Sequence, residues 1–178
     1  ALWKLSQLEK NPLMLAAIIK TWGARPGDAK VSAALRTHLA SMSHHQAVAS
    51  AAIAALRAQD DATAVPAILE RLRHDSLGFS SFQLAQAFDA VAFLARNDKD
   101  REPVRVFLTE QLNHSREDLR VGAAKALGTL RDPKSLAVLQ PLTARLKLSR
   151  DPVREAAEKS IAAREADQTK SQEGKEVG

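Results

Sequence analysis

A short helical pattern recurs along the chain and constrains its fold more than any other feature. The segment Leu119–Leu127 aligns without a gap with Val153–Ile161, which lies 34 residues further along. The same small-residue pattern ends upstream on Trp22, Leu56 and Leu94, so successive anchors lie 34, 38, 33 and 34 residues apart. A period in this range is typical of stacked helical repeats, in which each unit buries its faces on its neighbours.

The composition favours an all-helical protein. The 178 residues are 45% apolar but only 4% aromatic, with seven Gly and seven Pro, and alanine, the strongest helix former, dominates the apolar residues. The absence of cysteine excludes disulfides, thiolate metal sites and a cysteine nucleophile. The sequence has no run of about 18 apolar residues, so we expect no membrane-spanning segment.

Cap and turn signals divide the chain into helix pairs. Asn11-Pro12, Asp28, Ser43, Ser80 or Ser81 and Asp151-Pro152 are expected helix starts. The expected helices cover, approximately, residues 11–24, 28–41, 43–58, 62–74, 81–95, 102–112, 117–130, 136–148 and 151–167. Second-helix anchors track the first-helix anchors at Leu39, Leu72, Leu112 and Leu146. The predicted fold is therefore an all-α superhelix, or α-solenoid, of about four helix pairs plus a terminal helix, with an irregular third pair.

The expected domain boundaries follow from the same pattern. Residues 1–10 are expected to end a preceding helix, residues 11–167 to form the repeat domain, and the polar, aperiodic residues 168–178 to be disordered. The missing initiator Met and a first helix fragment led by Trp3 lead us to expect a piece of a longer protein.

Some of these residues resemble HEAT repeats, and most closely the short bacterial subtype found beside phycobilisome lyases. The residues that carry the resemblance are Leu119-Arg120, Ala126-Leu127-Gly128 and Asp132-Pro133. In this interpretation Leu127 fills the seam between helices and Gly128 relieves the helix end. The resemblance implies an armadillo-like solenoid that binds or holds other proteins.

A narrower resemblance is to the C-terminal helical region of bacterial aminopeptidase N-family zinc metallopeptidases. It rests on the segments 93–100, 103–105, 112–114 and 126–134. In that family the helical region follows the catalytic domain and closes over its substrate cavity. Neither the H-E-x-x-H motif nor the G-x-M-E-N segment of the family is present, so no catalytic residue is carried over.

The histidines, acidic pairs and tryptophans are the remaining candidates for a site. His38, His74 and His114 end second helices and could form a metal-binding ladder, but the helix macrodipole explains a histidine there equally well. Adjacent His44 and His45 would diverge by about 100° on a helix. The others are explained better as helix caps or as core: Asp60-Asp61, Glu117-Asp118, Ser80-Ser81, Trp3 and Trp22. We predict no catalytic, metal-binding or cofactor-binding residue, and the sequence does not identify the binding residues.

Three functions are compatible with these sequence features. The first is a non-catalytic C-terminal module of a zinc metallopeptidase, whose partner would be its own catalytic domain. The second is a free-standing scaffold that binds a protein or peptide. The third is nucleic-acid binding through a basic stripe formed by Arg71, Arg73, Arg105, Arg120, Arg145 and Arg154. We disfavour the third, because the 26 basic and 21 acidic residues are interspersed and aromatic residues are few.

Overall fold

The computed structural model describes residues 2–74, 76–143 and 151–176, and the side chains of residues 3–74, 76–143 and 151–167. All regular secondary structure in these ranges is helical. The predicted all-α helical-repeat fold is confirmed. Two compact units make up the chain, Ala1–Ala95 and Arg96–Gly178.

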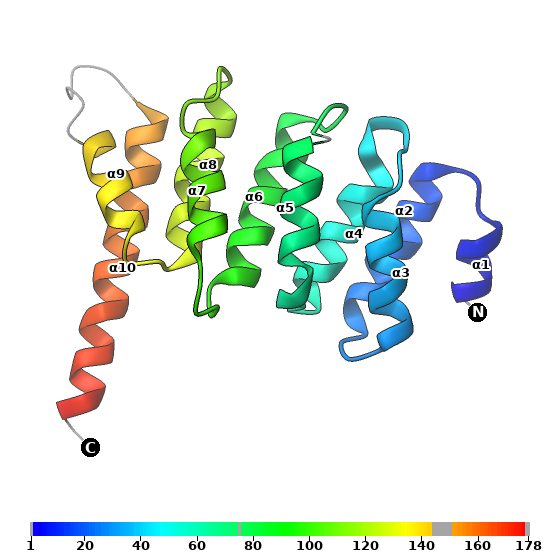
Figure 1. Cartoon of the computed structure of the whole chain (residues 1–178), viewed down its shortest axis with the longest axis horizontal. Helices are drawn as coiled ribbons and strands as arrows, with labels where there is room; N and C mark the ends of the chain where they lie inside the picture. The colour runs from blue at the N-terminus through cyan, green and yellow to red at the C-terminus, as the bar shows by residue number, and fades with distance from the viewer. Residues whose placement is uncertain (1, 75, 144–150, 177–178) are drawn as a thin grey trace. The chain divides into compact units, whose positions relative to one another are not determined.

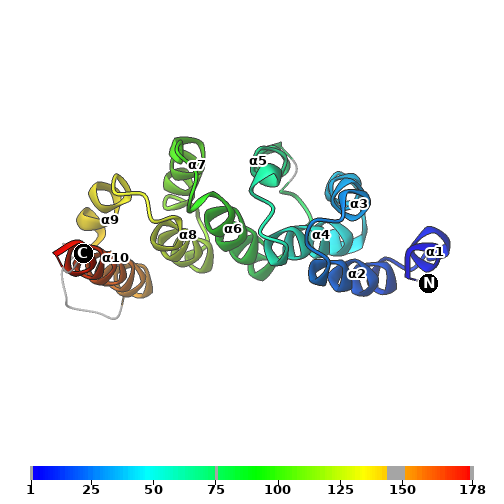
Figure 2. The ribbon, with the colours of Figure 1, turned by 90° about the horizontal axis from the view of Figure 1, so that it is seen from below.

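The first unit stacks helices in two rows. One row holds α2, α4 and α6, and the other holds α3 and α5 (Figures 1 and 2). The short α1 adjoins α2. The bounds are α1 Leu2–Leu8, α2 Pro12–Thr21, α3 Ala29–Leu39, α4 Ala47–Ala58, α5 Val65–His74 and α6 Ser81–Ala95. The anchors Trp22, Leu56 and Leu94 are each at most 1% exposed, as the repeat pattern requires.

The second unit has the same construction. It contains α7 Glu102–Gln111, α8 Glu117–Leu130, α9 Ser135–Thr143 and α10 Pro152–Glu176. Both α7 and α9 pack on α8, and α10 packs on α8 and α9. Leu127 is fully buried, whereas Ile161 at the equivalent position of α10 is half-buried. The expected anchor Leu146 lies outside the described residues.

Side-chain caps fix where the helices begin. The Asn11 side-chain oxygen accepts from the Leu13 amide at 2.9 Å, and Asp28 and Asp151 accept equivalent amide hydrogen bonds at the starts of α3 and α10. Ser80 and Gln83 form a reciprocal capping box at the start of α6. These caps satisfy amides that have no partner within the helix, and they confirm the predicted helix starts.

The structure corrects the interpretation of Gly128. Because α8 continues to Leu130, Gly128 lies within the helix and does not relieve its end. A Cβ atom on Gly128 would lie 2.5 Å from Ser160 Oγ, and this hydroxyl donates to the Ala124 carbonyl at 3.0 Å. Gly128 therefore allows α8 and α10 to approach closely.

Two helix ends also differ from the sequence expectation. The helix predicted from Ser43 begins only at Ala47, because His45 and Gln46 both have a φ of 50° and interrupt it. Consequently His44 and His45 do not diverge on a helix, and their rings lie 3.9 Å apart, edge to face. The last helix, α10, continues past the expected end at Asp167 to Glu176. The added residues are rich in Lys, Glu and Gln, which favour helix locally, so apolar periodicity alone underestimated its length.

Candidate protein-binding surfaces

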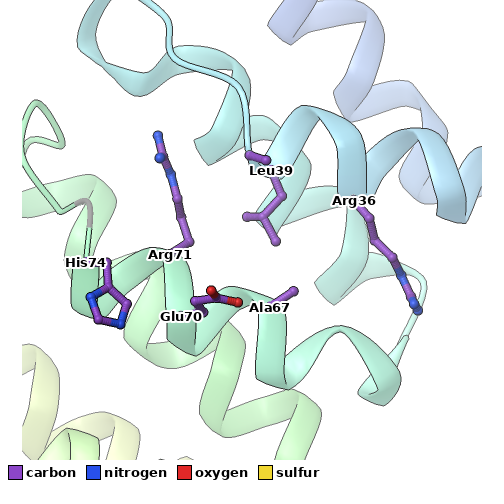
Figure 3. A pocket seen from close by; sticks show the side chains of 7 residues that line it. Arg36, Leu39, Ala67, Glu70, Arg71 and His74 are labelled. Carbon is purple, nitrogen blue, oxygen red and sulfur yellow. The ribbon is translucent and has the colours of Figure 1, made fainter.

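A groove lies between α3 and α5 of the first unit. It encloses about 310 Å³ and is lined by Arg36, Leu39, Ala40, Ala67, Glu70, Arg71 and His74 (Figure 3). Leu39 and Ala67 give it an apolar floor, because Leu39 belongs to the buried face of α3 and Ala67 is half-buried on α5. Charged side chains flank this floor, so the groove combines an apolar contact surface with polar groups.

Arg36 is fixed at one edge of the groove. Its guanidinium contacts the Asp61 carboxylate at 3.1 Å and also donates to the Thr63 hydroxyl. Partial burial raises the pKa of Asp61, but hydrogen bonds from Thr63 and Arg36, together with the Arg36 charge, outweigh it and leave the pKa below its usual value. Asp61 therefore stays ionised near neutral pH and holds Arg36 in place.

Arg71 joins the groove to the loops at the ends of the helices. Its guanidinium donates to the Gln46 side-chain oxygen at 2.8 Å and to the Ser41 carbonyl at 3.3 Å. Gln46 in turn donates to the Leu77 carbonyl at 2.9 Å. The left-handed conformation of Gln46 is thus supported by a buried hydrogen-bond network that ties two loops to α5.

A second groove lies between α1 and α3. It encloses about 470 Å³ and is lined by Trp3, Gln7, Lys30, Ala33, Ala34, Thr37 and His38. Trp3 stacks on Trp22 with ring centroids 5.5 Å apart, and Trp22 is almost fully buried. The core assignment of Trp22 is confirmed, and Trp3 covers the first repeat while remaining 44% exposed. Burial lowers the pKa of His38, which keeps its imidazole neutral at physiological pH.

The histidines do not assemble a metal site. His38 lies in the groove beside α1, His74 lies in the α3–α5 groove, and His114 Nδ1 accepts from the Arg116 amide at 3.0 Å. Over the described ranges of the chain, three metal-ligating side chains nowhere come together.

The arginines proposed as a basic stripe are engaged within the protein. Arg71 is buried, Arg105 contacts Asp132 at 3.0 Å, Arg120 donates to the His114 carbonyl at 2.9 Å, and Arg154 contacts Glu158 at 3.5 Å. Arg145 lies outside the described residues. Side chains committed to carboxylates and carbonyls offer few donors to phosphates, so this arrangement argues against a nucleic-acid interface.

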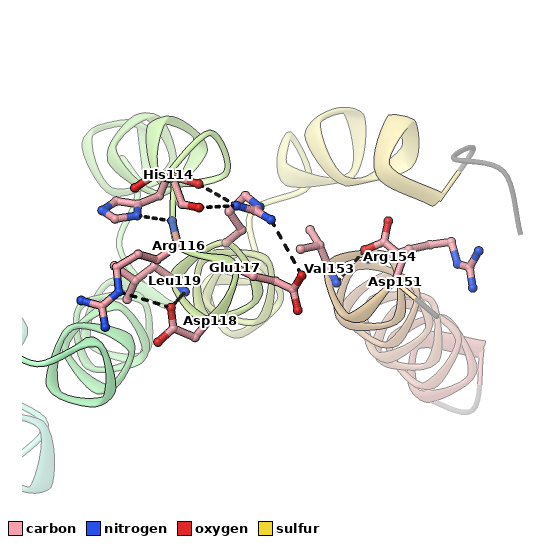
Figure 4. Close-up of polar contacts among 10 residues, drawn as sticks. His114, Arg116, Glu117, Asp118, Leu119, Asp151, Val153 and Arg154 are labelled. Atoms are coloured by element: carbon pink, nitrogen blue, oxygen red, sulfur yellow. Dashed lines mark hydrogen bonds and ion pairs between the residues drawn. The ribbon is translucent and has the colours of Figure 1, made fainter. Parts of the chain in front are cut away.

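The acidic pair that begins α8 has a structural role. Asp118 accepts from the Leu119 amide at 3.0 Å, and Glu117 lies 4.0 Å from Arg120 (Figure 4). Asp151 occupies the position of Glu117 one repeat later, where it caps α10. The predicted assignment to helix starts is confirmed for this pair.

Sequence reasoning missed the groove-lining side chains. Leu39 was identified as an anchor, but Ala67 and Glu70 attracted no attention because their spacing follows the ordinary periodicity of α5. Their significance arises only when α3 and α5 lie side by side, which brings together residues that are distant in sequence.

The paired, stacked helices define the class: this is a helical-repeat protein. The family model for the PBS lyase HEAT-like repeat matches residues 119–145, which span α8 and α9. This match supports a HEAT-like repeat protein and a non-catalytic repeat scaffold. No curated protein matches the sequence. Among the described residues, no helix is both long and apolar enough to cross a membrane.

Proposed function

We propose that this protein is a scaffold that binds a segment of another protein in the α3–α5 groove. The groove itself supports the proposal: Leu39 and Ala67 can receive an apolar side chain, while Arg36 and Glu70 offer polar contacts on either side (Figure 3). Helical-repeat proteins commonly bind partners along the surfaces that their stacked helices create. An extended peptide of mixed apolar and polar character fits this lining.

A peptide selection tests the proposal. A random dodecamer library displayed on phage would be selected against the folded chain, and the enriched peptides would be measured by fluorescence anisotropy. Ala67→Arg places a long charged side chain in the groove, and we expect it to weaken binding by about tenfold or more. Ala54→Arg on the exposed surface of α4 is the matched control and should leave binding within about twofold.

The contrary outcome is clear. Failure to enrich any peptide, or equal loss of binding in Ala67→Arg and Ala54→Arg, would contradict a binding site in the groove. Circular dichroism of both variants separates loss of binding from loss of structure.

A second candidate is a role as the C-terminal module of an aminopeptidase N-like zinc metallopeptidase. Its support is the resemblance of segments 93–100 and 126–134, together with the exposed apolar side chains Leu5, Leu8 and Leu13 near the first helices, which a preceding domain could cover. Reading the parent gene tests this candidate. An upstream H-E-x-x-H domain in the same reading frame supports it, and an unrelated or absent upstream domain refutes it.

A further inference from the structure

We propose that an exposed apolar face of α2 docks a helix from a helical-repeat partner, and that this helix presents two small residues four positions apart. The α2 face consists of Leu13, Met14, Ala17 and Thr21, all of which are exposed. The site is distinct from the α3–α5 groove, and the inference does not rest on peptide binding there.

The internal repeat shows that this face is a stacking position. In repeat register, Met14, Ala17 and Thr21 of α2 correspond to Val48, Ala51 and Ala55 of α4 and to Val153, Ala156 and Ser160 of α10. In α4 and α10 all six of these side chains are at most 7% exposed. In α2, by contrast, Met14 is 56% exposed and Leu13 beside it is 66% exposed. The same positions that bury a neighbouring helix twice in the chain are thus uncovered in α2.

The seam between α8 and α10 shows what kind of helix would cover the face. Ser160 packs against Gly128 and donates its hydroxyl hydrogen to the Ala124 carbonyl at 3.0 Å. Thr21 stands in the place of Ser160, and its hydroxyl now donates to the Ile18 carbonyl of its own helix at 2.6 Å. A partner helix with small residues at the positions of Ala124 and Gly128 could approach Thr21 as closely.

The seam between α2 and α4 follows the same rule. A Cβ atom on Gly23 would lie 3.4 Å from the Ala55 Cα atom and 2.9 Å from the Ala58 Cβ atom. Gly23 and Gly128 occupy the same position in their repeats, one residue after the anchor. Two seams of this chain therefore join a small residue after the anchor of one helix to a small residue before the anchor of the next.

A second copy of this chain is a poor occupant. If copies stacked end to end, α10 would meet the α2 face with its side opposite to α8, and Glu158 there replaces the apolar Ile19 of α2. Glu158 is exposed and lies 3.5 Å from Arg154. Burying this carboxylate against Met14 and Ala17 would cost desolvation without a new charged partner. A separate helical-repeat partner with an apolar, small-residue face fits better.

A helical peptide copied from α8 is a suitable probe. We would use residues 116–131 with a hydrocarbon staple that replaces Gly122 and Ala126, since these lie on the opposite side of the helix from Ala124 and Gly128. A fluorescein label reports binding by anisotropy. The peptide contains no tryptophan, so Trp3 and Trp22, the only two tryptophans of the protein, report from beside the docking face whether the peptide binds there.

We expect saturable binding that also changes the tryptophan fluorescence. Thr21→Arg and Met14→Glu should each weaken binding by about tenfold or more, because they place a charge in the seam. Ala54→Arg and the groove variant Ala67→Arg should both bind within about twofold of the parent. A peptide with Gly128→Leu should lose binding, because the leucine cannot fit against Thr21.

Several results would overturn the inference. These are no saturable binding, equal binding by the Gly128→Leu peptide, or unchanged binding to Thr21→Arg and Met14→Glu. Sedimentation of the protein alone at the same concentrations provides a further check: if the α2 face mediates self-association that the peptide merely disrupts, a second copy is the occupant and the proposal is wrong.

Discussion

The seam between α8 and α10 and the seam between α4 and α6 join the same repeat positions by different chemistry. In the first, Gly128 meets Ser160, and nothing larger than a hydroxyl separates the helices. In the second, Arg57 takes the place of Gly128, its guanidinium lies 4.5 Å from the centre of the Phe93 ring, and it also contacts Asp89 at 2.8 Å. The packing of α4 on α6 is less extensive than that of α8 on α10.

The difference shows that side-chain size around the anchor determines how closely two repeats pack. The interval between Leu56 and Leu94 is also the longest in the chain, at 38 residues. The sequence irregularity of the third pair therefore coincides with a seam that is bridged by long side chains.

The largest effect should come from the anchors, which are buried in both regions. We expect Leu127→Ala and Leu56→Ala each to lower the free energy of unfolding by about 2–5 kcal/mol, because each removes a fully buried leucine and leaves a cavity. Chemical denaturation followed by circular dichroism measures the loss. Leu77→Ala, at an 84% exposed position, should change stability by less than about 0.5 kcal/mol. A loss below about 1 kcal/mol in Leu127→Ala would mean that the repeat register is wrong.

The same new side chain should have unequal effects in the two seams. Gly128→Leu forces a large group against Ser160 and should cost about 1–3 kcal/mol or more. Arg57→Leu introduces the same residue where a long side chain already fits, so we expect a change below about 1 kcal/mol. Thermal unfolding of the two variants compares them directly, and equal losses would remove the distinction between the seams.

Helix caps should contribute equally to both regions. Asp151 caps α10 and Ser80 caps α6, so Asp151→Ala and Ser80→Ala should each cost about 1 kcal/mol. Denaturation of the two variants under identical conditions provides the measurement. A much larger loss in one of them would indicate that the helices themselves, rather than the seams, differ in stability.

The smallest effect should come from the charged pair in the α4–α6 seam. Arg57 and Asp89 are 42% and 41% exposed, so solvent screens their attraction. We expect Asp89→Asn to cost only about 0.2–1 kcal/mol, and added salt to reduce this difference. A larger loss that persists at high salt would show that the pair acts through packing and not through charge.

Much of the fold was predictable because it depends on local chemistry. Capping residues such as Asn11, Asp28 and Asp151 act on amides two or three residues away, so the sequence alone located these helix starts. The buried anchors were predictable because small residues and leucine recur at a fixed spacing.

The surfaces were less predictable because they depend on contacts between distant residues. Gly128 has the sequence context of a helix terminator, and only its contact with Ser160 reveals its role in packing. The left-handed His45 and Gln46 likewise depend on Arg71 and Leu77. The groove exists only where α3 and α5 lie together. The disorder expected for residues 168–178 and the single repeat domain over residues 11–167 stay predictions.

The most direct test of the repeat register is a double-mutant cycle between Gly128 and Ser160. Gly128→Ala should destabilise the protein by about 1–3 kcal/mol, although alanine favours helix over glycine, because its methyl group meets the Ser160 side chain. In a Ser160→Gly background the same substitution should cost at least about 1 kcal/mol less, since the obstructing side chain is gone. An equal cost of Gly128→Ala in both backgrounds would show that these residues do not meet and would contradict the stacking described above.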